Sequence, residues 1–243
     1  MTLDAPMRLL AGTSGYAFKE WKGSFYPEDL KADGMLGYYA TRFPTVEINN
    51  TFYRMPRENV LQDWASQVPE TFTFAIKASQ RITHHARLKP ESKELLEYLI
   101  RNTATLGNRL GPVLFQLPPN MKKDIDRLRT FLEFLPADRK FTIEFRNSTW
   151  FDEDVVEALR ARNVALAITD QSDFATPPIS SATWGYLRLH RFDYSEASLT
   201  EWAARVKEQQ WEEVYVYFKH DEGEGSGPPA VDAFLKVIHA GTP

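Results

Sequence analysis

Charged and polar side chains able to transfer protons or hold an anion recur near the ends of short apolar runs in this chain. In the run Thr45–Asn49, Glu47 and Asn49 alternate with two β-branched apolar residues. This period-two pattern predicts a strand with one apolar face and one polar face. Later runs end in the same way with Lys77, Gln116, Glu144, Arg146, Arg188 and His190. Carboxylates, an ammonium group, guanidinium groups and an imidazole brought together would suit acid–base chemistry on an anionic molecule.

Eight runs of this kind are predicted to be buried strands. They are Arg8–Ser14, Thr45–Asn49, Phe72–Lys77, Pro112–Leu117, Phe141–Arg146, Val164–Asp170, Gly185–His190 and Val214–Lys219. Segments with helical periodicity separate most of them, but the sixth connection, 171–183, holds two adjacent prolines and is predicted to contain little or no helix. Strands that alternate with helices indicate a parallel sheet with right-handed crossovers.

We therefore predict an α/β protein with one (β/α)8 barrel of the TIM type, in which the sixth crossover helix is missing or reduced. The alternative is an open, doubly wound sheet. Its dinucleotide-binding fingerprint is absent, because Gly12-Thr13-Ser14-Gly15 lacks the third glycine and the helix start that should follow.

Alternation along the strands predicts which side chains face the barrel interior. The apolar parity of each run should pack on helices, and the polar parity should point inward near the carboxyl ends of the strands, where barrel active sites lie. Asp170 has the parity of an apolar neighbour and is expected just beyond its strand. The inward set has four cations, Lys77, Arg146, Arg188 and Lys219, against the carboxylates Glu47 and Glu144. This excess favours an anionic ligand; the alternative is a salt-bridge network that only stabilises the barrel.

Composition limits the class of protein. A length of 243 residues suits a single barrel domain spanning 1–243, and 43% hydrophobic with 26% charged residues is ordinary for a globular chain. The absence of cysteine excludes disulfides, thiolate metal sites and a cysteine nucleophile. The formal net charge of −4 makes nucleic acid a less favoured partner than a small anion. The N-terminus has no apolar run long enough for a signal peptide or a membrane span, so a cytoplasmic location is expected.

Each polar group has a candidate role and a structural alternative. The candidates for proton transfer are Glu47, Glu144, His190 and Lys77, and the structural alternative for the carboxylates is pairing with Arg or Lys. The candidates for contact with the substrate are Asn49, Tyr53, Arg54, Gln116, Arg146, Asp170, Arg188, Tyr217 and Lys219. Tyr53 and Arg54 follow the second strand and are expected at the rim of the barrel.

Seven blocks of the sequence resemble a known family. They are GTSGYAFKEWKGSFYP (12–27), YYATRFPTVEINNTFYRMP (38–56), TFAIKASQRITH (73–84), LGPVLFQLPP (110–119), EFRNSTW (144–150), YLRLH (186–190) and VYVYFKHD (214–221). In this order they resemble the domain of unknown function 72, or YecE-like, family. The resemblance covers almost the whole chain and implies a TIM barrel related to sugar-isomerase-like barrels, with no established reaction. Lys219, His220 and Asp221 stand where the family tends to carry asparagines.

These observations predict an enzyme that performs acid–base chemistry on a small, anionic, polar metabolite similar to a sugar phosphate. One alternative is a non-catalytic binding protein for a phosphorylated ligand or a nucleic-acid end. Another is a metal-dependent enzyme similar to sugar isomerases, with Glu47, Glu144, Asp170 and His190 around a divalent ion. No cofactor is predicted, because four neighbouring cations would compete with a metal for the same carboxylates.

Overall fold

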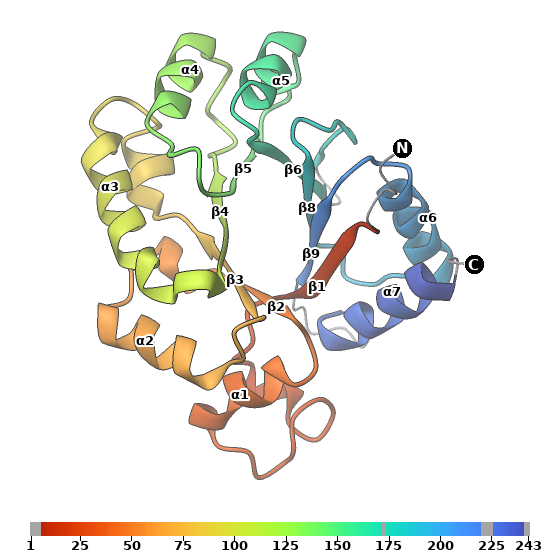
Figure 1. Cartoon of the computed structure of the whole chain (residues 1–243). Helices are drawn as coiled ribbons and strands as arrows, with labels where there is room; N and C mark the ends of the chain where they lie inside the picture. Colours follow the sequence, from red (N-terminus) through yellow and green to blue (C-terminus); the bar gives the residue numbers. More distant parts are fainter. Residues whose placement is uncertain (1–5, 172–173, 220–225, 241–243) are drawn as a thin grey trace.

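The computed structural model describes residues 6–171, 174–219 and 226–240. Within them, eight parallel strands form a closed barrel surrounded by helices (Figure 1). The barrel strands are β1 (Arg8–Ser14), β2 (Thr45–Ile48), β3 (Thr73–Lys77), β4 (Leu110–Gln116), β5 (Phe141–Glu144), β6 (Ala165–Gln171), β8 (Trp184–Leu189) and β9 (Glu213–Lys219). Pairing of β1 with β9 and of β5 with β6 completes the circle. The predicted (β/α)8 barrel is confirmed.

The helices lie outside the barrel. They are α1 (Met35–Ala40), α2 (Glu58–Gln67), α3 (Ser92–Thr103), α4 (Ile125–Glu133), α5 (Glu153–Arg160), α6 (Glu196–Lys207) and α7 (Pro228–Ala240). The sixth connection, in its described part 174–183, holds no helix; it contains the short strand β7 (Phe174–Ala175), which pairs antiparallel with β6. None of the helices in the described ranges is long and apolar enough to cross a membrane.

Two apolar layers confirm the predicted alternation of side chains. The outer layer lies between strands and helices and includes Phe74, Ile143 and Phe218. The inner layer fills the barrel, and its buried residues are Leu10, Ala75, Leu114, Ala165, Ala167, Trp184, Tyr186, Tyr215 and Tyr217. Some residues of the inner layer, such as Ala75 and Tyr186, stand two positions before a charged residue, Lys77 and Arg188, on the same strand. The inner layer therefore lies directly beneath the charged side chains.

Three boundary predictions are corrected. Asp170 lies inside β6, since this strand continues to Gln171 and pairs there with β7. Strand β5 ends at Glu144, so Arg146 belongs to the following loop. Strand β8 ends at Leu189, so His190 is the first residue beyond it. The divergent residues His220 and Asp221 lie outside the described residues.

Close contact between β1 and β2 requires glycine at position 12. A Cβ atom on Gly12 would overlap the Thr45 carbonyl oxygen and lie 2.9 Å from the Tyr39 hydroxyl oxygen. That hydroxyl accepts a hydrogen bond from the Thr13 amide at 2.8 Å and donates to the Thr45 carbonyl at 3.0 Å. The missing side chain thus lets a helix residue hold two strands together.

We predict that Gly12→Ala lowers the free energy of unfolding by about 2–3 kcal/mol, because the added methyl group pushes against backbone. Urea unfolding followed by circular dichroism measures this. Gly37→Ala is the matched control: its Cβ would meet only the Gln67 carbonyl at 3.6 Å, so alanine should stabilise α1 by about 0.5–1 kcal/mol. Equal changes in the free energy of unfolding for Gly12→Ala and Gly37→Ala would contradict the claim that the close contact of β1 with β2 requires glycine at position 12.

Candidate functional site

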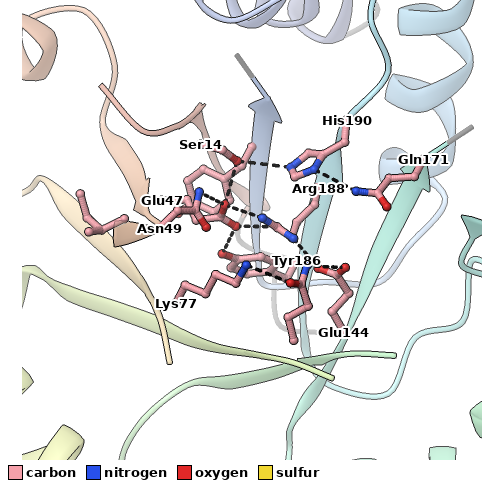
Figure 2. Close-up of polar contacts among 12 residues, drawn as sticks. Ser14, Glu47, Asn49, Lys77, Glu144, Gln171, Tyr186, Arg188 and His190 are labelled. Atoms are coloured by element: carbon pink, nitrogen blue, oxygen red, sulfur yellow. Dashed lines mark hydrogen bonds and ion pairs between the residues drawn. The ribbon is translucent and has the colours of Figure 1, made fainter. Parts of the chain in front are cut away.

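A cluster of charged and polar side chains lies at the carboxyl ends of the barrel strands (Figure 2). Glu47 comes from β2, Lys77 from β3, Glu144 from β5 and Arg188 from β8. Parallel strands place their carboxyl ends on the same rim, so residues far apart in the chain meet there. We call this cluster the mouth site.

Arg188 is the centre of the mouth site. It is 3% exposed, and its guanidinium lies between two fully buried carboxylates. Its Nε and Nη2 donate to the two oxygens of Glu47 at 2.8 and 3.0 Å, and its Nη1 donates to Glu144 Oε2 at 2.5 Å. Figure 2 shows the guanidinium bridging the two glutamates. Arg188 therefore serves as a clamp on both carboxylates in this structure.

Ionisation of the two glutamates follows from this clamp. Burial alone would raise the pKa of Glu47, but the Arg188 guanidinium outweighs burial and lowers it to about 2. For Glu144, burial is likewise overcome by Arg188 and Arg146, and its pKa falls well below the usual range. Both carboxylates are thus negatively charged at neutral pH, and their pKa values are not split as an acid–base pair requires.

Further hydrogen bonds occupy the same carboxylates. Glu47 accepts from Ser14 Oγ at 2.8 Å, Asn49 Nδ2 at 2.9 Å and Tyr186 Oη at 2.8 Å. Glu144 accepts from Gln116 Nε2 at 2.9 Å and Arg146 Nε at 2.7 Å. This saturation holds both carboxylates in fixed positions.

Lys77 differs from the other cations of the cluster. Its ammonium group donates to Gln116 Oε1 at 2.9 Å and lies 4.2 Å from the centre of the Phe52 ring. Within the described part of the chain it forms no ion pair with a carboxylate. Burial, followed by repulsion from Arg188, lowers the pKa of Lys77 to about 8. Lys77 is therefore a half-buried amine whose pKa is close to neutral pH, and it lies beside glutamates whose charges are offset by arginines.

His190 closes the mouth site on the β8 side. Its Nε2 lies 3.3 Å from Ser14 Oγ, and its Nδ1 lies 3.5 Å from Gln171 Nε2. Burial, together with the charge of Arg188, lowers the pKa of His190 to about 3, so the ring is neutral at physiological pH. A chain of polar contacts therefore runs from Gln171 through His190 and Ser14 to Glu47.

Asp170 supports His190 from below the site. Its Oδ1 accepts from the His190 backbone amide at 2.7 Å, and its Oδ2 accepts from Tyr194 Oη at 2.8 Å and lies 3.4 Å from Arg191 Nε. Burial raises the pKa of Asp170 despite these partners. The geometry makes Asp170 a positioning residue for the loop that carries His190.

Three of the sequence-predicted residues lie apart from the cluster. Tyr53 is 75% exposed and, with Arg54, faces a groove outside the barrel mouth. Tyr217 is buried deeper in the barrel, with its hydroxyl 2.7 Å from Thr45 Oγ1. Lys219, by contrast, borders the cluster: it lies at the exposed end of β9, pairs in register with Ser14, and its charge helps to lower the pKa of His190.

Sequence reasoning left three members of the cluster out of the predicted site. Tyr186 stands two residues before Arg188 on the same strand, so the parity rule already pointed it inward. Ser14 ends β1 and pairs in register with Glu47. Gln171 ends β6, but its contact with His190 crosses to another strand and has no local signal.

The donor set does not fit a resident divalent metal. The described residues contain no group of three or more His, Asp or Glu side chains that could hold a metal ion. Glu47 and Glu144 are bound to Arg188, while Asp170 is engaged by the His190 backbone. A metal at this position would have to displace a guanidinium from two ion pairs.

Fold and site together define a (β/α)8 barrel protein with a cluster of charged side chains at the carboxyl ends of its strands. Its family follows from the family model "Protein of unknown function DUF72", which matches residues 10–242. The chain belongs to the DUF72 family.

Individual relatives agree with this assignment. The chain is 27% identical over 240 residues to the UPF0759 protein YunF of Bacillus subtilis, a match that covers 82% of this chain and 85% of that protein. It is 30% identical over 138 residues to the UPF0759 protein YecE of Escherichia coli, covering 54% of this chain and 50% of that one. A DUF72 family protein from Thermotoga maritima has a similar structure, with a TM-score of 0.81 and 28% identity over 96% of this chain and 98% of that chain.

We predict that Arg188→Met lowers the free energy of unfolding by about 3–5 kcal/mol at pH 7, because it leaves two buried carboxylates without their shared partner. The pH dependence should also reverse. In the wild type, the lowered pKa of Glu47 adds stability that is complete above pH 4.5 and is lost as the pH falls toward about 2. In the variant, burial raises the carboxylate pKa values, so stability should recover as the pH falls toward 5.

Urea unfolding between pH 3 and 8 measures both effects. Arg160→Met is the control, because its ion pair with Glu153 spans 3.7 Å at an exposed position and should contribute less than about 1 kcal/mol. An Arg188→Met protein that loses stability in acid in parallel with the wild type would contradict the clamp.

Proposed function

We propose that this protein is an enzyme that binds a small, anionic, polar metabolite, of the sugar-phosphate kind, at the mouth site and transfers a proton on it. The observation that carries the proposal is the charge of Lys77. Its ammonium group has no carboxylate partner among the described residues, although it is half-buried. A cation in this state is stabilised by any anion that reaches it.

The balance of charge in the cluster supports an anionic ligand. Arg188 and Arg146 offset the charges of Glu47 and Glu144, so Lys77 remains as an excess positive charge. Arg146 uses its Nε on Glu144, and its two terminal nitrogens have no hydrogen-bond partner within the described ranges. The charge of Arg146 helps to lower the pKa of Lys77, so an anion near Lys77 would be favoured by both cations.

Lys77 suits proton transfer better than the two glutamates do. A general acid or base works best when its pKa lies near the operating pH, and the pKa of Lys77 is about 8. His190 is neutral, because its pKa is lowered to about 3, and in the proposal it contributes a polar contact to Ser14 and does not act as a base. The glutamates are fixed by Arg188, so their role in the proposal is to hold that guanidinium and the cluster around it.

A non-catalytic binding protein for a phosphorylated ligand is the second candidate. It is favoured by the same clamp, because two ionised carboxylates locked in ion pairs leave few groups free for chemistry. Binding with turnover would support the enzyme, and binding of the same ligand without turnover would support this candidate.

We predict that Lys77→Met weakens binding of sulfate at the mouth site about tenfold or more, the effect of losing one charge-assisted contact. Sulfate is a suitable probe because its charge does not change near neutral pH. In the wild type, binding should weaken as the pH rises through about 8, where Lys77 loses its proton. In Lys77→Met that dependence should disappear.

Isothermal titration calorimetry with sulfate, followed by activity assays on a panel of sugar phosphates, measures these effects. The matched control is Lys207→Met, on the exposed surface at the end of α6. Circular dichroism verifies that each variant is folded. Sulfate affinity that is the same in folded Lys77→Met and in the wild type would refute the proposal.

A further inference from the structure

A second site lies beside the barrel mouth. A groove of about 460 Å³ lies between the segment that leads into α2, the loop after β3 and α3. That volume is within the usual range for small-molecule sites. Its polar and aromatic lining consists of Tyr53, Arg54, Arg57, Ser79, Arg81 and Tyr98. We propose that this groove binds a nucleotide, with the arginines on its phosphates and the tyrosines against its base.

The charge of the groove points to a phosphorylated ligand. Arg54, Arg57 and Arg81 line it, and the lining contains no carboxylate. None of the three forms an ion pair with a described residue. Guanidinium groups that line one groove without a carboxylate are suited to bind phosphates through bidentate hydrogen bonds.

Arginines elsewhere in the described chain are of two kinds, and some, such as Arg109, Arg139 and Arg162, form no ion pair there but donate to backbone carbonyl oxygens. Several others have a carboxylate within 4.0 Å: Arg42 with Asp232, Arg127 with Asp124, Arg160 with Glu153 and Arg205 with Glu201. The groove thus concentrates unneutralised arginine in a protein whose formal net charge is −4. An overall excess of basic residues therefore does not explain the three arginines of the groove.

The aromatic residues of the groove indicate that the phosphorylated ligand also carries a planar base. Tyr53 is 75% exposed and Tyr98 is 49% exposed, and they are two of the three large, exposed hydrophobic residues in the described part of the chain. Both line this groove. Exposed rings beside guanidinium groups are suited to stacking on a planar base. A sugar phosphate has no such ring, so the combination favours a nucleotide.

The size of the groove favours a single nucleotide over a nucleic-acid strand. A strand needs a continuous basic track, whereas these arginines converge on one cavity. The site is also separate from Lys77: Ser79 follows Lys77 by two residues, but Lys77 does not line the groove. The inference therefore stands apart from the proposed function, and a substitution can remove either site alone.

Calorimetry at low salt with ATP, tripolyphosphate and adenosine tests this inference. ATP should bind the wild type, and the double variant Arg54→Ala/Arg81→Ala should bind it at least tenfold more weakly. Tyr98→Ala should weaken ATP about fivefold or more while changing tripolyphosphate less than twofold, because only ATP has a base to stack. Adenosine should bind more weakly than ATP.

Two controls separate this site from the mouth site. Arg129→Ala removes an exposed arginine from α4, and Lys77→Met removes the excess charge of the mouth; both should leave ATP affinity unchanged. The inference is overturned if ATP does not bind, if the arginine double variant binds it normally, or if Lys77→Met abolishes binding. It is equally overturned if an oligothymidylate binds through these arginines more than tenfold tighter than ATP, since the occupant is then a strand.

Discussion

The structure depends on one guanidinium shared by two buried carboxylates. Ionised groups inside a barrel are costly unless each is paired and hydrogen-bonded, and Arg188 meets that requirement for Glu47 and Glu144 at once. The arrangement needs β2, β5 and β8 to end at matching heights on the rim. The mouth site therefore requires this register of the barrel, because a shift in register of any of these strands would leave a buried charge without a partner.

The clamp also determines the character of the remaining groups. Because Arg188 offsets the glutamates, Lys77 experiences burial and cationic neighbours more strongly than it experiences negative charge, and its pKa falls to about 8. The same positive neighbour and the same burial keep His190 neutral. An amine with a lowered pKa and a neutral imidazole thus accompany the ion pairs of Arg188. The proposed chemistry uses groups that the clamp tunes, not the groups of the clamp itself.

The fold and much of the cluster were predictable from the sequence, because alternation along a strand is a local property. The eight barrel strands and the inward direction of Glu47, Lys77 and Glu144 follow from period-two patterns alone. The ion pairs of Arg188 could not be predicted from these patterns. Whether Arg188 binds a substrate or two glutamates depends on how strands far apart in the chain are aligned with one another. The positions of Tyr53 and Arg54 were likewise not predictable from local sequence patterns. They follow β2 as predicted, but the short helix η3 (Asn50–Phe52) intervenes, and they line the outer groove.

The most direct test of the account is a titration of the Lys77 amine by NMR, with ¹³C-labelled lysine and assignment through Lys77→Met. The account predicts a pKa near 8 in the free protein, far below the ordinary value of 10.5, and an increase when sulfate is added, because a bound anion stabilises the protonated form. A pKa near 10.5 that does not respond to sulfate would contradict the claim that Arg188 neutralises the glutamates and leaves Lys77 to hold an anion.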